Sequence, residues 1–193
     1  MARITWPYLS FKYDVDFLLT KQSILHIVSW RIAFYTHITS SLLVLVTGLF
    51  QFVRHLLLHY PAVHKWAGRI YVAAILLVSA PSGLVMAFYA SGGFWAKLSF
   101  GIISVLWWYF TWQGYRKAVT KDIPSHQAFM YRSYALTLSA ITLRTLAWLL
   151  PFFSHIHHLH GREMYVWIAW LSWIPNLLIA EWLIKRRRLP LPA

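Results

Sequence analysis

The chain of 193 residues contains no cysteine and only five acidic residues. The missing cysteines exclude disulfide scaffolds, thiolate metal sites and cysteine nucleophiles. The few carboxylates argue against enzymes that need a catalytic pair of them, and no Walker loop, glycine-rich dinucleotide turn, HExxH or GxSxG motif is present. The common hydrolases are therefore not indicated, and the sequence leaves open whether the protein is an enzyme.

Apolar and aromatic residues are abundant instead. Of all residues, 59% are hydrophobic and 12% are charged, whereas about 25% are charged in a typical soluble domain. Five apolar runs approach the roughly 20 residues that a helix needs to cross hydrocarbon; they are Ile32–Val53, Ile70–Tyr89, Leu98–Tyr115, about 127–153 and Met164–Ile184. The sequence therefore predicts an all-α integral membrane bundle of about five transmembrane helices.

The predicted bundle occupies residues 32–185, between an N-terminal external or interfacial segment (1–31) and a basic tail (186–193). The net charge is +13, and the side that carries the tail holds 11 Lys and Arg near the span ends against six on the other side. Because Lys and Arg concentrate on the cytoplasmic side, we expect a multi-pass protein of the cytoplasmic (inner) membrane with its C-terminus inside and its N-terminus outside. We therefore expect the basic side chains to contact the lipid bilayer, which is the expected partner, and not to bind nucleic acid.

Ionisable side chains are costly inside hydrocarbon, so each one within a span is a candidate functional residue. In the first span His37 and His55 are 18 residues apart, which is five helical turns. We expect them to share one face of a single helix, close to the stripe that holds Gln51.

In the fourth span His126 and Arg144 are also 18 residues apart, and Ser133 and Thr137 lie along the same stripe. Such small polar residues suit a face turned toward neighbouring helices. The direction of this helix places His126 toward the inner surface and Arg144 toward the outer leaflet.

Histidines at equal depth on separate helices are the arrangement that a b-type haem needs, because neutral imidazole is a good axial ligand for iron. His64 and His126 both lie at the start of a span, and they are our candidate axial pair. His37 is a candidate for a second site, and Arg69 and Arg144 are candidate partners for an anion such as a haem propionate. The leading hypothesis is an electron-transfer protein that exchanges electrons with a redox partner or a quinone.

Two other interpretations use the same residues. The polar layers would also suit a metal-ion or small-molecule binding or transport protein without haem. Alternatively, the protein is a non-catalytic membrane subunit whose histidines and arginines only hold the bundle together. Glu181, the one acid deep in the last span, is four residues from Lys185 and would form an ion pair with it on the same helix.

Several motifs resemble those of a known family. They are Phe34-Tyr35-Thr36-His37-Ile38, Gly48-Leu49-Phe50-Gln51-Phe52, His64-Lys65-Trp66-Ala67-Gly68-Arg69-Ile70-Tyr71, Gly92-Gly93, Asp122-Ile123, His126, Met130–Thr137 and Thr142-Leu143-Arg144. Over roughly residues 7–150 the chain is similar to the domain of unknown function 2306 family of bacterial predicted membrane proteins. The resemblance implies a membrane architecture and a set of candidate positions, namely His37, Gln51, His64, Arg69, His126, Arg132 and Arg144. The His-x-x-x-Gly start of the second span also resembles cytochrome b561 and ferric-reductase-like bundles at the level of fold.

Overall fold

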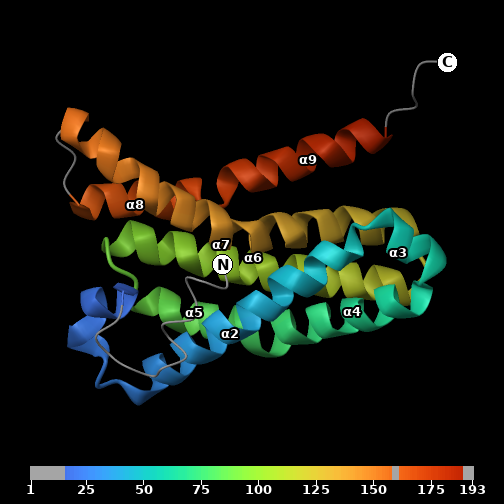
Figure 1. The fold of residues 1–193 in the computed structure, drawn as a ribbon, viewed down its shortest axis with the longest axis horizontal. Coiled ribbons are helices and arrows are strands. Elements are labelled where there is room, and N and C mark those ends of the chain that lie inside the picture. The colour runs from blue at the N-terminus through green and yellow to red at the C-terminus, as the bar shows by residue number, and fades with distance from the viewer. Residues whose placement is uncertain (1–15, 158–160, 189–193) are drawn as a thin grey trace. The chain divides into compact units, whose positions relative to one another are not determined.

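The computed structural model describes residues 16–157 and 161–188, and in these ranges every regular element is a helix. Figure 1 shows the elements in chain order. The chain divides into two compact units, Met1–Ala90 and Ser91–Ala193. The all-α prediction is confirmed over the described residues.

The first unit is built around one long helix that packs against the return path of the chain. Its elements are η2 (Asp16–Ile24), α2 (Val28–Gln51), α3 (Arg54–His59), α4 (Pro61–Ala74), η3 (Ile75–Ser79) and α5 (Ala80–Phe88). Helix α2 packs along α4, η3 and α5. At one end, Leu18 of η2 packs with Trp30 and Phe34 of α2 in a buried apolar cluster, so the described part of the N-terminal segment is attached to the first long helix.

Proline accounts for two features of this unit. Pro61 begins α4, where its missing N–H costs nothing because that group would have no partner in the helix. Pro81 lies in the first turn of α5 and cannot donate to the carbonyl of Leu77, four residues earlier. Leu77 belongs to η3, a single turn of π-helix inside an otherwise continuous helical path. Such π-turns are frequent at functional sites.

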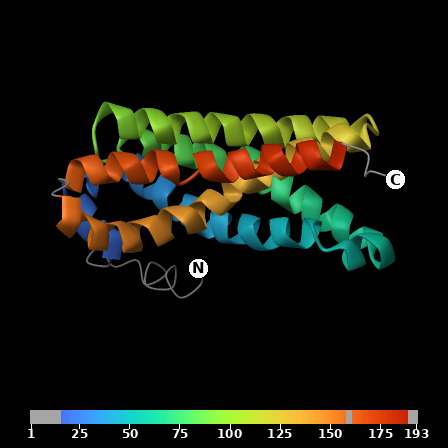
Figure 2. The same cartoon turned by 90° about the horizontal axis from the view of Figure 1, so that it is seen from above.

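The second unit contains α6 (Phe94–Val119), α7 (Ile123–His157), α8 (Gly161–Leu171) and α9 (Ile174–Arg188). Helices α6 and α7 run in opposite directions, and Figure 2 shows them diverging away from the turn that joins them. Helix α8 packs against both α6 and α7, and α9 packs against α7. Ser133 and Thr137 of α7 are buried in this unit.

Backbone chemistry also sets the breaks in this unit. Gly92 and Gly93 have φ of 89° and 78°, which glycine adopts without the steric cost that other residues meet, and α6 begins directly after them. Pro175 cannot donate to the carbonyl of Leu171, the last residue of α8. The predicted fifth span is consequently two helices, with the break at residues 172–173.

Three helical stretches in the described part of the chain are long and apolar enough to cross a membrane: Val28–Gln51, Pro61–Phe88 and Gly161–Arg186. They correspond to the first, second and fifth predicted spans. The third and fourth predicted spans lie within α6 and α7, which are 26 and 35 residues long. Large apolar side chains point outward from the long helices, for example Leu77 at 75% exposure and Leu178 at 64%, as suits contact with lipid.

Candidate functional site

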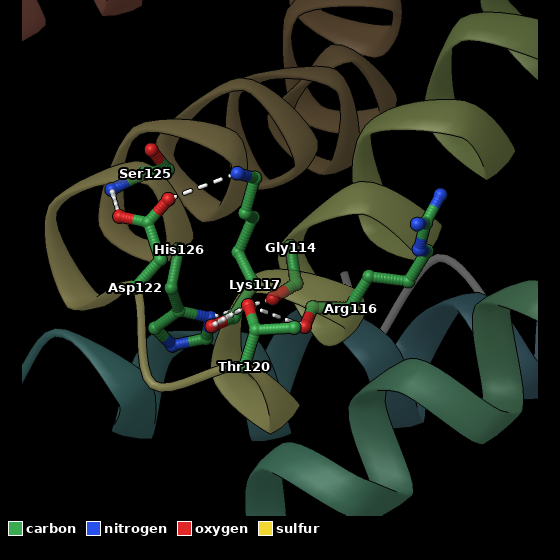
Figure 3. Close-up of polar contacts among 7 residues, drawn as sticks. All are labelled: Gly114, Arg116, Lys117, Thr120, Asp122, Ser125 and His126. Carbon is green, nitrogen blue, oxygen red and sulfur yellow. Dashed lines mark hydrogen bonds and ion pairs between the residues drawn. The ribbon is translucent and has the colours of Figure 1, made fainter.

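The candidate site begins at the turn between α6 and α7 (Figure 3). Lys121 has a positive φ of 60°, which reverses the chain after α6. Asp122 then caps α7, because its Oδ1 accepts the backbone N–H of Ser125 at 3.2 Å. Its other oxygen accepts from Nζ of Lys117 at 2.9 Å, so the end of α6 and the start of α7 are joined by an ion pair.

This ion pair changes the acidity of Asp122. Its pKa is lowered below the ordinary 3.8, chiefly because Lys117 donates a hydrogen bond to the carboxylate and also because Ser125 does so. The carboxylate is therefore charged at neutral pH, where it favours the positive N-terminal end of α7. Together these contacts fix the helix turn that carries His126.

The imidazole of His126 points back to α6. Its Nδ1 lies 2.8 Å from the carbonyl oxygen of Gly114, as Figure 3 shows. A carbonyl can only accept, so Nδ1 carries the proton, and in the neutral ring the lone pair is on Nε2. Within the described residues His126 makes no other side-chain hydrogen bond. Ligating histidines are commonly held in this way, with one nitrogen bonded to a backbone carbonyl and the other presented to a metal.

Gly114 is needed where it is because the two helices approach closely. A Cβ at this buried position would lie 2.7 Å from Sδ of Met130 and 3.5 Å from Cβ of Phe129. The absence of a side chain lets α7 lie against α6, which brings the Gly114 carbonyl within reach of His126.

The same interface continues away from the turn as a buried polar seam. Thr111 and Ser133 are joined by their hydroxyls at 2.7 Å. One turn further, the indole Nε1 of Trp107 donates to Oγ1 of Thr137 at 3.1 Å. The predicted stripe on the fourth span is therefore confirmed for Ser133 and Thr137 together with His126, since all three contact α6.

Arg144 lies beyond this seam on α7. Its Nη1 donates to the carbonyl of Ala140 on its own helix at 2.9 Å. This bond satisfies part of the guanidinium locally.

Another candidate histidine, His37 of α2, lies in the first unit. Its Nδ1 lies 2.9 Å from the carbonyl oxygen of Ser79, the last residue of the π-turn. Oγ of Ser82 is also near, at 3.4 Å, and Oγ of Ser79 donates to Oγ of Ser40 at 2.7 Å. His37 therefore belongs to a polar cluster that joins α2 to η3 and α5, and its proton is on Nδ1 for the same reason as in His126.

His64, Arg69 and Gln51 lie elsewhere in this unit. His64 is half-buried in the first turns of α4, and Arg69 is exposed with Cζ 5.2 Å from the centroid of the Trp66 ring. Gln51 ends α2 and reaches α4, where its Oε1 would be 3.1 Å from a Cβ placed on Gly68. His64 belongs to the first unit and His126 to the second, so their pairing remains a prediction from depth along the helices.

The predicted single helix through His37 and His55 is wrong. Helix α2 ends at Gln51, and α3 begins at Arg54 after an extended residue at Val53. The five-turn periodicity therefore does not apply, because His55 is on a separate short helix.

An ion pair that the sequence did not predict joins α7 to α9. Arg132 donates from Nε and Nη2 to the two carboxylate oxygens of Glu181, with the Nη2 contact at 2.9 Å. The expected pairing of Glu181 with Lys185 on the same helix is replaced by this bidentate contact. The signal was available, since Arg132 and Glu181 are opposite charges within predicted spans and each is costly there alone.

No group of three or more His, Asp or Glu residues is arranged around a common point in the described part of the chain.

The family described as predicted membrane protein (DUF2306) matches residues 34–184, most of the chain. The chain belongs to this family. All seven positions proposed from the sequence motifs lie within the matched range of the DUF2306 protein. No curated protein and no solved structure gave a significant match.

Proposed function

We propose that this DUF2306 membrane protein binds b-type haem and transfers electrons through it. His126 and His64 would supply the two axial imidazoles. Bound haem would supply a one-electron carrier, and the protein would exchange electrons with a redox partner or a quinone.

The observation that carries this proposal is the hydrogen bond from Nδ1 of His126 to the Gly114 carbonyl. It selects one tautomer and fixes the ring, so that Nε2 is a ready electron-pair donor. The close approach of the helices that the missing side chain of Gly114 allows, and the Asp122–Lys117 pair, hold together the two helix ends that make this bond. The residues of the chain fit the group, because imidazole is available and the chain has no cysteine to offer thiolate ligation.

The remaining candidates have supporting roles in this proposal. Arg69 is exposed on α4 about 7.5 Å along the helix axis from His64, and its guanidinium suits a propionate. His37 has the same carbonyl-bonded Nδ1 as His126, which makes it the candidate ligand for a second site. Arg144 is a candidate to bind an anion, and Gln51 is a polar neighbour of α4.

The test is the haem content and visible spectrum of the full-length protein purified after expression with ample haem. We expect His126→Ala and His64→Ala to lose or strongly alter the low-spin bands of a bis-imidazole haem. His26→Ala is the matched control, because His26 is an exposed histidine before α2, and it should keep the parent spectrum.

Gly114→Ala separates positioning from ligation. It leaves every histidine in place but displaces the carbonyl that orients His126, so we expect haem to remain with a shifted reduction potential. A protein that binds no haem, or one whose bands survive both His126→Ala and His64→Ala, contradicts the proposal. Metal analysis of the same sample would then distinguish an ion-binding protein from a purely structural polar core.

A further inference from the structure

Two histidines outside this site share one face of α3. His55 and His59 are four residues apart on this short helix, and residues at that spacing are neighbours on a helix surface. Their rings are stacked, with centroids 4.3 Å apart and planes at 26°. Both side chains are exposed.

The hydrogen bonding of His59 favours metal ligation. Its Nδ1 lies 3.2 Å from the carbonyl oxygen of His55, so Nδ1 carries the proton and the lone pair is on Nε2. This is the bond to a backbone carbonyl that commonly orients ligating histidines.

We propose that His55 and His59 form a binding site for one divalent transition-metal ion at the connection between α2 and α4. Two imidazole nitrogens at 2.0–2.1 Å from a tetrahedral ion are about 3.3 Å apart. Rotation of the His55 ring about χ2, a broad torsion in histidine, turns one of its nitrogens toward Nε2 of His59, while His59 keeps its bond to the backbone carbonyl. Water would complete the coordination.

The types of ligand atom near α3 favour one class of metal ion. No Asp or Glu occurs between Asp16 and Asp122, so carboxylate oxygen is absent from the whole stretch that contains α3. A site of imidazole nitrogens suits Cu²⁺, Ni²⁺ and Zn²⁺, whereas Mg²⁺ and Ca²⁺ prefer oxygen ligands. Among the divalent ions Cu²⁺ should bind most tightly. The site does not depend on the haem proposal, because none of its residues takes part in haem ligation.

The experiment titrates Cu²⁺ into full-length protein purified in detergent with an affinity tag that lacks histidine. Calorimetry gives the dissociation constant, and electron paramagnetic resonance counts the coordinating nitrogens. We expect His55→Gln and His59→Gln each to raise the dissociation constant of one site at least about tenfold and to remove one nitrogen from its spectrum. His26→Gln, which removes an exposed histidine from another segment, should change neither.

Two further variants test the helical spacing and keep the number of histidines constant. His59→Gln with Leu58→His places the pair three residues apart, on the same face, and should restore tight binding. His59→Gln with Leu57→His places the pair two residues apart, on different faces, and should bind as weakly as His59→Gln. Binding that is unaffected by His59→Gln, or that is restored equally by both spacings, overturns the proposal.

Discussion

The ion pair between Arg132 and Glu181 should be a major contact between α7 and α9. Its contacts are bidentate, and the Arg132 side chain is only 18% exposed whereas that of Glu181 is 38% exposed. The guanidinium also packs over two rings, with Cζ 5.4 Å from the centroid of Phe129 and 5.9 Å from that of Phe110. Removing one partner of a buried pair leaves an uncompensated charge and typically costs about 3–5 kcal/mol.

We expect Arg132→Met to lower the free energy of unfolding by about 3 kcal/mol, at the lower end of that range because Glu181 is partly exposed. Glu181→Leu should cost about 2 kcal/mol, since Arg132 keeps its contacts with the two rings. The double variant should cost at least about 1 kcal/mol less than the sum, because no isolated charge remains.

The assay is a double-mutant cycle measured by reversible unfolding in mixed detergent micelles, followed by circular dichroism. A second cycle with Lys185→Met and Glu181→Leu is the matched control, because Lys185 lies one helical turn from Glu181. That cycle should be additive within about 0.5 kcal/mol. Additivity in the Arg132 cycle, or a larger coupling with Lys185, would refute the reasoning.

Three further predictions concern the second unit. Gly114→Ala should lower the free energy of unfolding by about 1 kcal/mol, because crowding against Met130 outweighs the better helix propensity of alanine. Because Met130→Ala removes this crowding, the double variant should lose less stability in detergent unfolding than the sum of the two single variants. Asp122→Asn keeps a helix cap but loses the charge that faces Lys117. Because the pKa of Asp122 is lowered below 3.8 in the folded protein, the stability that the charged carboxylate contributes is present above pH 3.8 and is lost as the pH falls through the pKa of the folded state. The parent should therefore lose more stability than the variant between pH 7 and about pH 3. In Ser99→Ala, the buried indole N–H that donates to Oγ of Ser99 at 3.0 Å loses its acceptor. This change should lower the free energy of unfolding by about 1–3 kcal/mol in the same assay, whereas Ser99→Thr should keep the acceptor.

The membrane character and the polar face of α7 could be predicted because they depend on local periodic patterns. Long apolar runs predicted helices, and a spacing of 18 residues placed His126 on the stripe that also holds Ser133 and Thr137. The structure confirms this stripe through contacts with Trp107, Thr111 and Gly114 of α6. Periodicity therefore predicted which side chains face a neighbouring helix.

The breaks in the helices were harder to predict because a hydropathy pattern continues through them. The first predicted span, Ile32–Val53, ends close to the end of α2 at Gln51, but the helical periodicity was extended beyond it to His55, and the shared face of His37 and His55 was wrong for that reason. Pro175 was a visible signal for a distortion of the last span, and the chain does break just before it.

Partners distant in sequence could not be read from spacing within one helix. Glu181 was paired with its nearest cation on the same helix, whereas Arg132, 49 residues away in sequence, forms the contact. The carbonyl partners of His126 and His37 were equally hidden, because any residue supplies a carbonyl and only the packed helices decide which one is near. Gly114 was the best clue to the first of these, since a glycine within an apolar helix indicates close approach.

His126, whose Nδ1 bonds to the Gly114 carbonyl, and His64 are the proposed haem ligands of this membrane protein. The most direct measurement is a reduced-minus-oxidised visible spectrum of the purified full-length parent, with haem quantified against protein. We predict the narrow bands of a low-spin, bis-imidazole haem at about one haem per chain or more, the higher value applying if the His37 site is also filled. A colourless protein from cells supplied with ample haem would contradict the account.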